Sequence, residues 1–147
     1  MEKINYKTKL NELLATYQLH YQNLRSLHWN IKGQNFFELH LKYEELYNRS
    51  QIIIDDIAER LLVLEQKPFY SFTHYLKNSK IEENNYITDG KEGMKYILNA
   101  QEVILSLENE ILKLSSSEND EGTTSMMSDL IREKEKTNWM FKSWLEN

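Results

Sequence analysis

The feature that most constrains this chain is its shortage of residues that interrupt a helix. Its 147 residues include only four Gly and a single Pro, at position 68. Proline lacks the backbone donor that an interior helical turn needs, and glycine adds an entropic cost there. A chain with so few of either favours long continuous helices. No segment has the short alternating pattern of a strand, so we expect an all-α protein.

Apolar residues recur at intervals of three and four in four long segments, as they do on one face of a helix. In the first segment they extend from Leu10 to Ile31, and Gly33 can end that helix. The second segment begins near Asn35 and is limited by Pro68. At about 28 residues it would span roughly 40 Å.

The rest of the chain completes the pattern. Next comes an aromatic-rich stretch, in which Ser71 could cap one or two helical turns. A third long helix is expected from Thr88 or Asp89, and a fourth after Gly122. We therefore expect one domain, residues 1–147, that forms a four-helix bundle with a short extra helix in the crossover between helices two and three.

The composition excludes several classes of protein. There is no Cys, which rules out disulfides, thiolate metal sites and cysteine nucleophiles. No stretch approaches the roughly 18 apolar residues of a membrane span, and the first residues lack the apolar core of a signal peptide, so we expect a cytoplasmic protein with no membrane contact. The net charge is -5, from 23 acidic and 18 basic side chains, which suits the attraction of cations better than the binding of nucleic acid.

The second segment carries four side chains that could bind a metal. His40 and Glu44 are four residues apart and share a helix face, and Asp55 and Glu59 repeat that spacing. Eleven residues, about three helical turns, separate the two pairs, so all four share one stripe. An imidazole and three carboxylates suit iron, manganese or zinc. The alternative is an ordinary solvated face, which leaves the alignment with His40 unexplained.

The two pairs are too far apart to share one metal within a single chain. Glu44 and Asp55 would lie about 16 Å apart along the helix axis. An antiparallel copy of the same helix would bring residues 55–59 of one chain opposite residues 40–44 of its partner, with a two-fold axis near residues 49–50. A two-fold contact generates two equivalent sites. The spacing therefore predicts a metal site between subunits.

His28 is the fifth candidate ligand. It stands at the end of the first helix, just before the short turn into the second, which would place it near His40. A lone histidine on an apolar stripe is more often a core or edge residue. We assign that interpretation to His20 and His74, which have no acidic neighbours at helical spacing.

Five short stretches combine in an unusual spacing. They are residues 27–33 (LHWNIKG), 36–40 (FFELH), 43–47 (YEELY), 55–60 (DDIAER) and 139–144 (WMFKSW). Together they closely resemble the Dps family of mini-ferritins, over nearly the whole chain. The resemblance implies a ferritin-like bundle. The Glu-x-x-His motif of larger ferritins is absent, which disfavours their intrachain di-iron site.

In the Dps family each ferroxidase centre is formed by two subunits. The resemblance implies that His28, His40 and Glu44 come from one subunit. Asp55 and Glu59 would come from its partner and hold the more tightly bound iron. The two histidines would serve a weaker or transient second metal position.

The resemblance also implies roles outside the centre. Trp29 would lie near the centre and quench stray radicals, unless it is a core-packing aromatic. Acidic pores lead into the family's hollow shell, and Asp120, Glu121 and Asp129 are the candidates for lining them. The alternative for these three is an ordinary acidic loop, which is favourable near a helix N-terminus.

The function that the resemblance implies is iron oxidation and storage. The protein would oxidise Fe²⁺ with hydrogen peroxide, or more slowly with dioxygen, and keep ferric mineral in a hollow dodecamer, which protects against oxidative damage. The founding members bind DNA through a Lys-rich N-terminal tail, but only Lys3 precedes the first expected helix, so direct DNA binding is doubtful. The competing interpretations are a nucleoid protein that coats DNA and a helical interaction module without chemistry.

Overall fold

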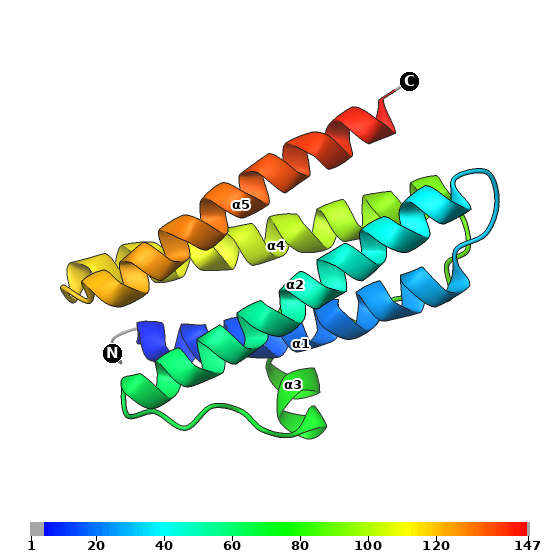
Figure 1. The fold of residues 1–147 in the computed structure, drawn as a ribbon. Coiled ribbons are helices and arrows are strands. Elements are labelled where there is room, and N and C mark those ends of the chain that lie inside the picture. Colours follow the sequence, from blue (N-terminus) through cyan, green and yellow to red (C-terminus); the bar gives the residue numbers. More distant parts are fainter. Residues whose placement is uncertain (1–4, 147) are drawn as a thin grey trace.

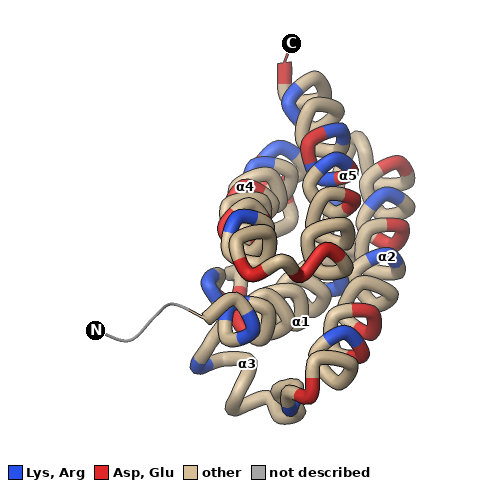
Figure 2. Tube along the Cα trace, turned by 90° about the vertical axis from the view of Figure 1, so that its left-hand side faces the viewer, with Lys and Arg blue, Asp and Glu red and all other residues tan. Residues whose placement is uncertain are grey.

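The structure is a computed structural model that describes residues 5–146. In that part of the chain it contains five α-helices and no strand (Figure 1). The helices are α1 (Tyr6–Asn30), α2 (Phe36–Val63), α3 (Phe72–Asn78), α4 (Gly90–Ser117) and α5 (Glu121–Leu145). Figure 2 views the four long helices nearly end-on, and α3 lies outside them against α1. The prediction of an all-α bundle with a short helix in the crossover is confirmed.

Most of the expected helix starts are confirmed by their caps. The side chain of Asp89 accepts a hydrogen bond of 2.9 Å from the backbone N–H three residues on, and Ser71 does the same for α3 at 3.3 Å. Such bonds satisfy a backbone donor that has no partner within the helix. Asn35 takes the capping position of α2 without a side-chain capping bond. α1 ends at Asn30, and Gly33 lies in the following turn with φ +101.

The start of α5 differs from the prediction. The helix begins at Glu121, before Gly122 rather than after it, because Asp120 caps it by accepting a hydrogen bond from the Thr123 backbone N–H. Gly122 therefore lies in the first turn. A β-carbon there would stand 2.6 Å from Nη2 of Arg60, so glycine allows the Arg60 guanidinium to approach the backbone.

Two apolar clusters form the core, one toward each end of the bundle. The first includes Leu14, Ile57 and Ile111, and the second includes Leu27 and Phe141. A layer of buried polar side chains lies between the clusters along α1, α4 and α5. None of the helices in residues 5–146 combines the length and apolar character that crossing a membrane requires.

The polar layer contains a buried carboxyl group, a buried ammonium and a buried phenol. The hydroxyl of Tyr17 donates a hydrogen bond of 2.8 Å to Oε2 of Glu108, and the ammonium of Lys134 lies 4.9 Å from the centre of the Tyr17 ring. Burial raises the pKa of Glu108 to about 6, against the opposing effects of Lys134 and Tyr17. Burial also lowers the pKa of Lys134. His20 is buried in the same layer, as the core interpretation of that histidine predicts.

Candidate metal centre

Two histidine rings meet where α1 ends and α2 begins. His28 lies near the end of α1 and His40 near the start of α2, and the turn of residues 31–35 sets the two helices side by side. Their ring centroids are 3.7 Å apart with an interplanar angle of 16°. Tyr47 contacts His28 edge-on at 5.3 Å, and Phe36 stacks on His40 at 5.0 Å. Aromatic neighbours therefore hold both imidazoles in place.

The two imidazoles are fixed by reciprocal hydrogen bonds. Nδ1 of His28 lies 2.6 Å from the backbone carbonyl oxygen of His40, and Nδ1 of His40 lies 2.8 Å from that of His28. A carbonyl oxygen can only accept, so each Nδ1 carries the hydrogen and donates it. In a neutral imidazole that is fixed in this way, Nε2 keeps its lone pair and can bind a metal. Metal-binding histidines commonly have their second nitrogen fixed in this way.

Glu44 completes this group on α2. Its Oε1 lies 3.8 Å from Nε2 of His28, and its side chain is half-exposed. The free nitrogen of His28 is therefore directed to the same region as a carboxylate. This places one acidic oxygen donor beside an imidazole nitrogen at the edge of the bundle.

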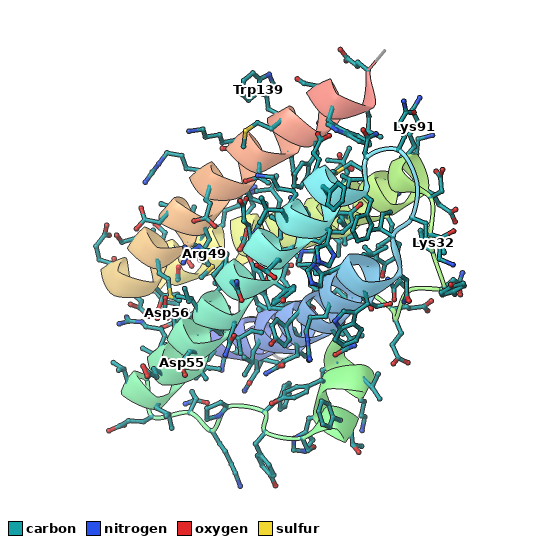
Figure 3. The ribbon with its side chains drawn as sticks, turned by 45° about the vertical axis from the view of Figure 1, so that its right-hand side comes forward. Lys32, Arg49, Asp55, Asp56, Lys91 and Trp139 are labelled. Carbon is teal, nitrogen blue, oxygen red and sulfur yellow. The ribbon has the colours of Figure 1, made fainter. Side chains whose placement is uncertain are left out.

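Asp55 and Glu59 lie elsewhere on the same helix. Both are exposed near the C-terminal end of α2, where Figure 3 labels Asp55. Neither has a hydrogen bond or an ion pair to any residue in the described part of the chain. Eleven residues separate Asp55 from Glu44, about 16 Å along the helix. Within residues 5–146 no group of three or more His, Asp or Glu side chains could hold a metal ion.

The outward face of α2 also carries exposed apolar side chains. They are Phe37, Leu41, Ile52 and Leu62. At about 100° per residue these positions fall on one stripe together with Asp55, opposite the buried face of the helix. Phe37 is 85% exposed and Ile52 54%. The signal for this stripe in the sequence is the pair of apolar runs at 52–54 and 61–64, which exceed what a single buried face requires.

Trp29 is not a core residue. Its side chain is 56% exposed, and the guanidinium of Arg25 stacks over its ring at 4.9 Å. The core-packing interpretation of Trp29 is therefore wrong. The location of Trp29 near the candidate centre rests on its place next to His28 in the sequence and stays a prediction.

The three acidic residues near the start of α5 have different surroundings. Asp120 accepts hydrogen bonds from Tyr6 and Arg60 as well as capping the helix. Burial would raise the pKa of Asp120, but the hydrogen bonds and the charge of Arg60 lower it to about 2. These bonds match the alternative interpretation of Asp120, an ordinary acidic residue near a helix N-terminus, rather than a free carboxylate that lines a pore. Glu121 and Asp129 are exposed, with Asp129 paired to Arg132 at 2.8 Å, and their role in a pore stays a prediction.

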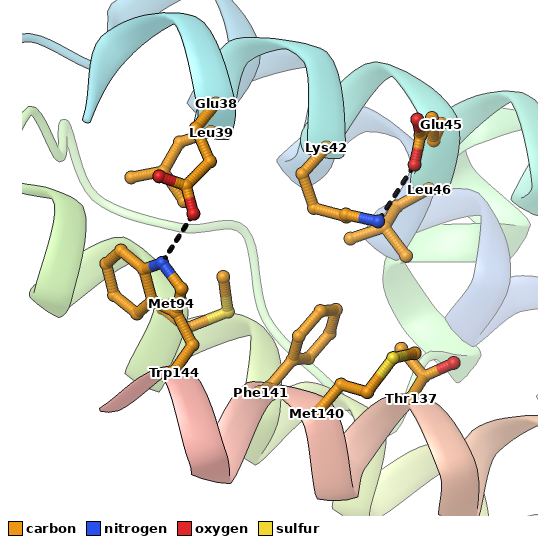
Figure 4. A pocket seen from close by; sticks show the side chains of 10 residues that line it. All are labelled: Glu38, Leu39, Lys42, Glu45, Leu46, Met94, Thr137, Met140, Phe141 and Trp144. Carbon is orange, nitrogen blue, oxygen red and sulfur yellow. Dashed lines mark hydrogen bonds and ion pairs between the residues drawn. The ribbon is translucent and has the colours of Figure 1, made fainter. Parts of the chain in front are cut away.

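A separate groove lies between the first half of α2 and the last half of α5 (Figure 4). Its lining is mostly apolar, with Leu39 and Phe141 among its residues. Its acidic groups have partners: Glu38 accepts from the indole N–H of Trp144 at 2.8 Å, and Glu45 pairs with a lysine. The groove therefore does not offer the free donor atoms that a metal centre needs.

Comparisons with known proteins agree with this architecture. A family model described as a ferritin-like domain matches residues 7–147. A DNA protection during starvation protein from Porphyromonas gingivalis is 35% identical over 92% of this chain and 85% of its own length. The Dps protein from Vibrio cholerae O1, described as a member of a broad superfamily of ferritin-like diiron-carboxylate proteins, is 45% identical. It superposes with a TM-score of 0.94 over 96% of this chain and 89% of that one.

A second similar structure is a Dps variant from Listeria innocua. In it two histidines, twelve positions apart, are replaced by glycine. It is 27% identical to this chain and superposes with a TM-score of 0.94, covering 98% of this chain and 96% of that one. The chain therefore belongs to the Dps family of ferritin-like proteins.

Proposed function

We propose that this protein oxidises Fe²⁺ at centres shared between two subunits and stores the ferric product as mineral. Hydrogen peroxide is the preferred oxidant, and dioxygen reacts more slowly. By consuming both ferrous iron and peroxide, the protein would limit hydroxyl-radical damage. Iron is the substrate and the stored product.

The observation that carries this proposal is the division of ligands on α2. His28, His40 and Glu44 form one half-centre at the start of the helix. Asp55 and Glu59 form the other, about 16 Å away, and their carboxylates have no partner among the described residues. Two half-centres separated in this way become one complete centre only when an antiparallel α2 supplies the missing half.

The exposed apolar stripe on α2 supports the same pairing. With a two-fold axis near residues 49–50, Phe37 of one subunit falls opposite the partner's Leu62. Ile52 lies close to the axis and meets the equivalent part of the other helix. Burying such side chains in a two-fold contact removes apolar surface from water, which stabilises the dimer.

Two relatives strengthen the assignment of iron and of the histidines. The Vibrio cholerae Dps is described as a ferritin-like diiron-carboxylate protein. The histidines replaced in the Listeria innocua variant have the same separation as His28 and His40, which are also twelve positions apart. We infer that these two histidines are metal ligands here.

The ligand types fit the reaction. Carboxylate oxygens favour Fe³⁺ over Fe²⁺ because the additional positive charge interacts more strongly with anionic donors. Asp55 and Glu59 would therefore hold the iron that is oxidised first, and His28 with His40 the second. Two Fe²⁺ and one hydrogen peroxide, with two protons, give two Fe³⁺ and two water molecules. Both electrons that peroxide requires then come from iron.

Family membership leads us to extend the proposal to a hollow dodecamer built from these dimers. Glu121 and Asp129, both exposed, are the remaining candidates for lining an acidic entry pore. Coating of DNA is less well supported. The net charge is -5, and in Figure 2 basic and acidic residues are interspersed along α2 and α5 rather than gathered on one basic face.

The test is anaerobic oxidation of Fe²⁺ on addition of hydrogen peroxide, followed optically. We expect fast oxidation by the wild type and loss of the fast phase in the double variant His40→Ala with Asp55→Ala. His74→Ala, which replaces a histidine on α3 far from the centre in sequence, serves as the control and should keep the wild-type rate. Equal slow rates in all three proteins would contradict the proposal.

A further inference from the structure

A series of tyrosines leads from the candidate centre into the polar layer of the bundle. Tyr47 contacts His28 edge-on at 5.3 Å, and Tyr21 contacts Tyr47 edge-on at 5.9 Å. Tyr17 lies one turn before Tyr21 on α1, about 6 Å along the axis, so both project from the same side of the helix. Ring contacts thus connect the buried His28 to Tyr21, and the fully buried Tyr17 is the next tyrosine along that side of α1. The reaction proposed above uses none of these three tyrosines.

The buried end of this series has its own proton acceptor. Tyr17 is 0% exposed, and its hydroxyl donates to Oε2 of Glu108 at 2.8 Å. The other oxygen of Glu108 is buried and has no hydrogen-bond partner in the described residues. That carboxylate can therefore accept a proton from Tyr17 without breaking another bond. Tyr43 provides a contrast, since it is equally buried but its hydroxyl has no partner within residues 5–146.

We propose that Tyr17 is a redox-active tyrosine, which supplies one electron to peroxide reduction at the iron centre through Tyr21 and Tyr47 and gives its proton to Glu108. The inference rests on the proposed function, because it needs ferrous iron and hydrogen peroxide at the centre.

The step matters when only one Fe²⁺ is bound. Peroxide needs two electrons and a single Fe²⁺ supplies one. Without another donor the O–O bond breaks to give hydroxide and a hydroxyl radical. With Tyr17 as donor, peroxide, Fe²⁺, the phenol, the Glu108 carboxylate and two solvent protons give two waters, Fe³⁺, a tyrosyl radical and protonated Glu108. A later Fe²⁺ returns the electron, Glu108 returns the proton, and Tyr17 is restored.

The surroundings of Tyr17 favour this coupled transfer. A tyrosine that lost only an electron would become a buried cation, which is costly in a low-dielectric interior. Passing the proton to Glu108 leaves a neutral radical instead. Because burial raises the pKa of Glu108 to about 6, that group is ionised at neutral pH yet more basic than an exposed glutamate. The charge of Lys134 close to the ring adds to the cost of a phenol cation, which also favours release of the proton.

The experiment is freeze-quench electron paramagnetic resonance of the assembled protein, loaded with one Fe²⁺ per centre and mixed with hydrogen peroxide. We expect an organic-radical signal in the wild type that narrows when the protein contains ring-deuterated tyrosine. The signal should be lost in Tyr17→Phe and retained in the matched control Tyr43→Phe. Spin-trapped hydroxyl radical should rise in Tyr17→Phe and not in Tyr43→Phe.

A second pair of variants tests the route and the proton acceptor. Tyr21→Phe combined with Tyr47→Phe leaves Tyr17 and its hydrogen bond in place but removes the two oxidisable rings between it and the centre. We expect the Tyr17 signal to disappear there as well. Glu108→Gln keeps a hydrogen-bond acceptor but removes the base, so it should also suppress the signal in protein that is shown to be assembled.

The outcomes separate this inference from the proposed function. Fast iron oxidation with a radical signal of equal size in the wild type and Tyr17→Phe overturns the role of Tyr17 and leaves the ferroxidase proposal standing. A Tyr17 signal that persists without Tyr21 and Tyr47 overturns the route. If the wild type shows no peroxide-driven iron oxidation, both proposals fail.

Discussion

His20 differs from the candidate ligands His28 and His40 in the hydrogen bonding of its imidazole ring. His28 and His40 each fix Nδ1 on a backbone carbonyl and keep Nε2 available. His20 is buried in the polar layer, and its Nδ1 has no hydrogen-bond partner among residues 5–146. Burial, and then the positive charge of Lys134, lower the pKa of His20 to about 3. The fold therefore holds this imidazole neutral well into the acid range.

Because folding lowers the pKa of His20, the stability of the bundle depends on pH through this residue. Between pH 6.5, the ordinary pKa of histidine, and about 3, the unfolded chain binds a proton that the folded chain does not. The free energy of unfolding therefore falls as the pH drops through this window, by about 1.4 kcal/mol per unit. We expect His20→Gln to remove this dependence. Relative to the wild type it should gain about 2 kcal/mol between neutral pH and about pH 5, measured by urea unfolding of iron-free protein.

Glu108 acts in the opposite direction but does not obscure the comparison. Its raised pKa makes the folded chain bind more protons between pH 4.5 and about 6, so its burial is less destabilising as the pH falls. Both proteins contain Glu108, and this contribution cancels in their difference. His74→Gln, on the half-buried α3, is the matched control and should follow the wild type. A difference between His20→Gln and the wild type that stays constant with pH would contradict the assignment.

At the scale of elements, α2 presents two faces with separate roles. Its buried face packs in the core through Ile53 and Ile57. Its outward face carries Asp55 and Glu44 in one stripe with the exposed apolar side chains, and His40 lies at the edge of that stripe next to α1. The register of one helix therefore fixes the core, the half-centre and the predicted dimer contact together. A shift by one residue would disturb all three.

Ile52 offers a direct test of the outward face. Because Ile52 lies close to the predicted two-fold axis, Ile52→Lys would place two like charges near each other in the dimer, which costs several kcal/mol. We expect dissociation into monomers, measured by analytical ultracentrifugation, together with loss of fast iron oxidation. Val103→Lys is the control, since Val103 is also exposed but lies on α4. Assembly of Ile52→Lys at the wild-type mass would contradict an α2 interface.

At the scale of the whole molecule, the sequence predicted what depends on local periodicity. The long helices and the caps Ser71 and Asp89 follow from the spacing of apolar residues and from side chains that bond within one turn. The proximity of His28 and His40 was predictable as well, because only a short turn separates their helices. The start of α5 was predicted too late because Gly122 suggests a loop, whereas Asp120 caps the helix by a local bond and Gly122 lies in its first turn.

The polar layer could not be predicted from local periodicity. Tyr17 and Glu108 are 91 positions apart, and their hydrogen bond depends on how α1 packs against α4. Neither residue stands out in the sequence, since a tyrosine on an apolar stripe and a glutamate on a helix are both common. The proposed metal centre depends on contacts at a still larger scale, because its second half would belong to another molecule.

The proposed division of the centre between subunits has a consequence that a centre within one chain does not share. Asp55→Ala and His40→Ala should each abolish fast oxidation when assembled alone. In a mixed dimer, one centre carries both defects and the other carries neither. Random pairing of equal amounts therefore restores about a quarter of the wild-type centres. Co-expression of the two inactive variants, purification of the mixed assemblies and measurement of peroxide-driven iron oxidation would detect this recovery.

The matched control pairs two defects from the same half-centre. Co-assembly of His40→Ala with Glu44→Ala leaves every centre with a damaged first half, so no recovery is expected. Recovery in the first mixture and not in the second requires that Asp55 act in the partner's centre. If neither mixture recovers although mixed dimers form, each chain must complete its own site. The separation of about 16 Å along α2 would then have to be bridged by a different assembly of the helices.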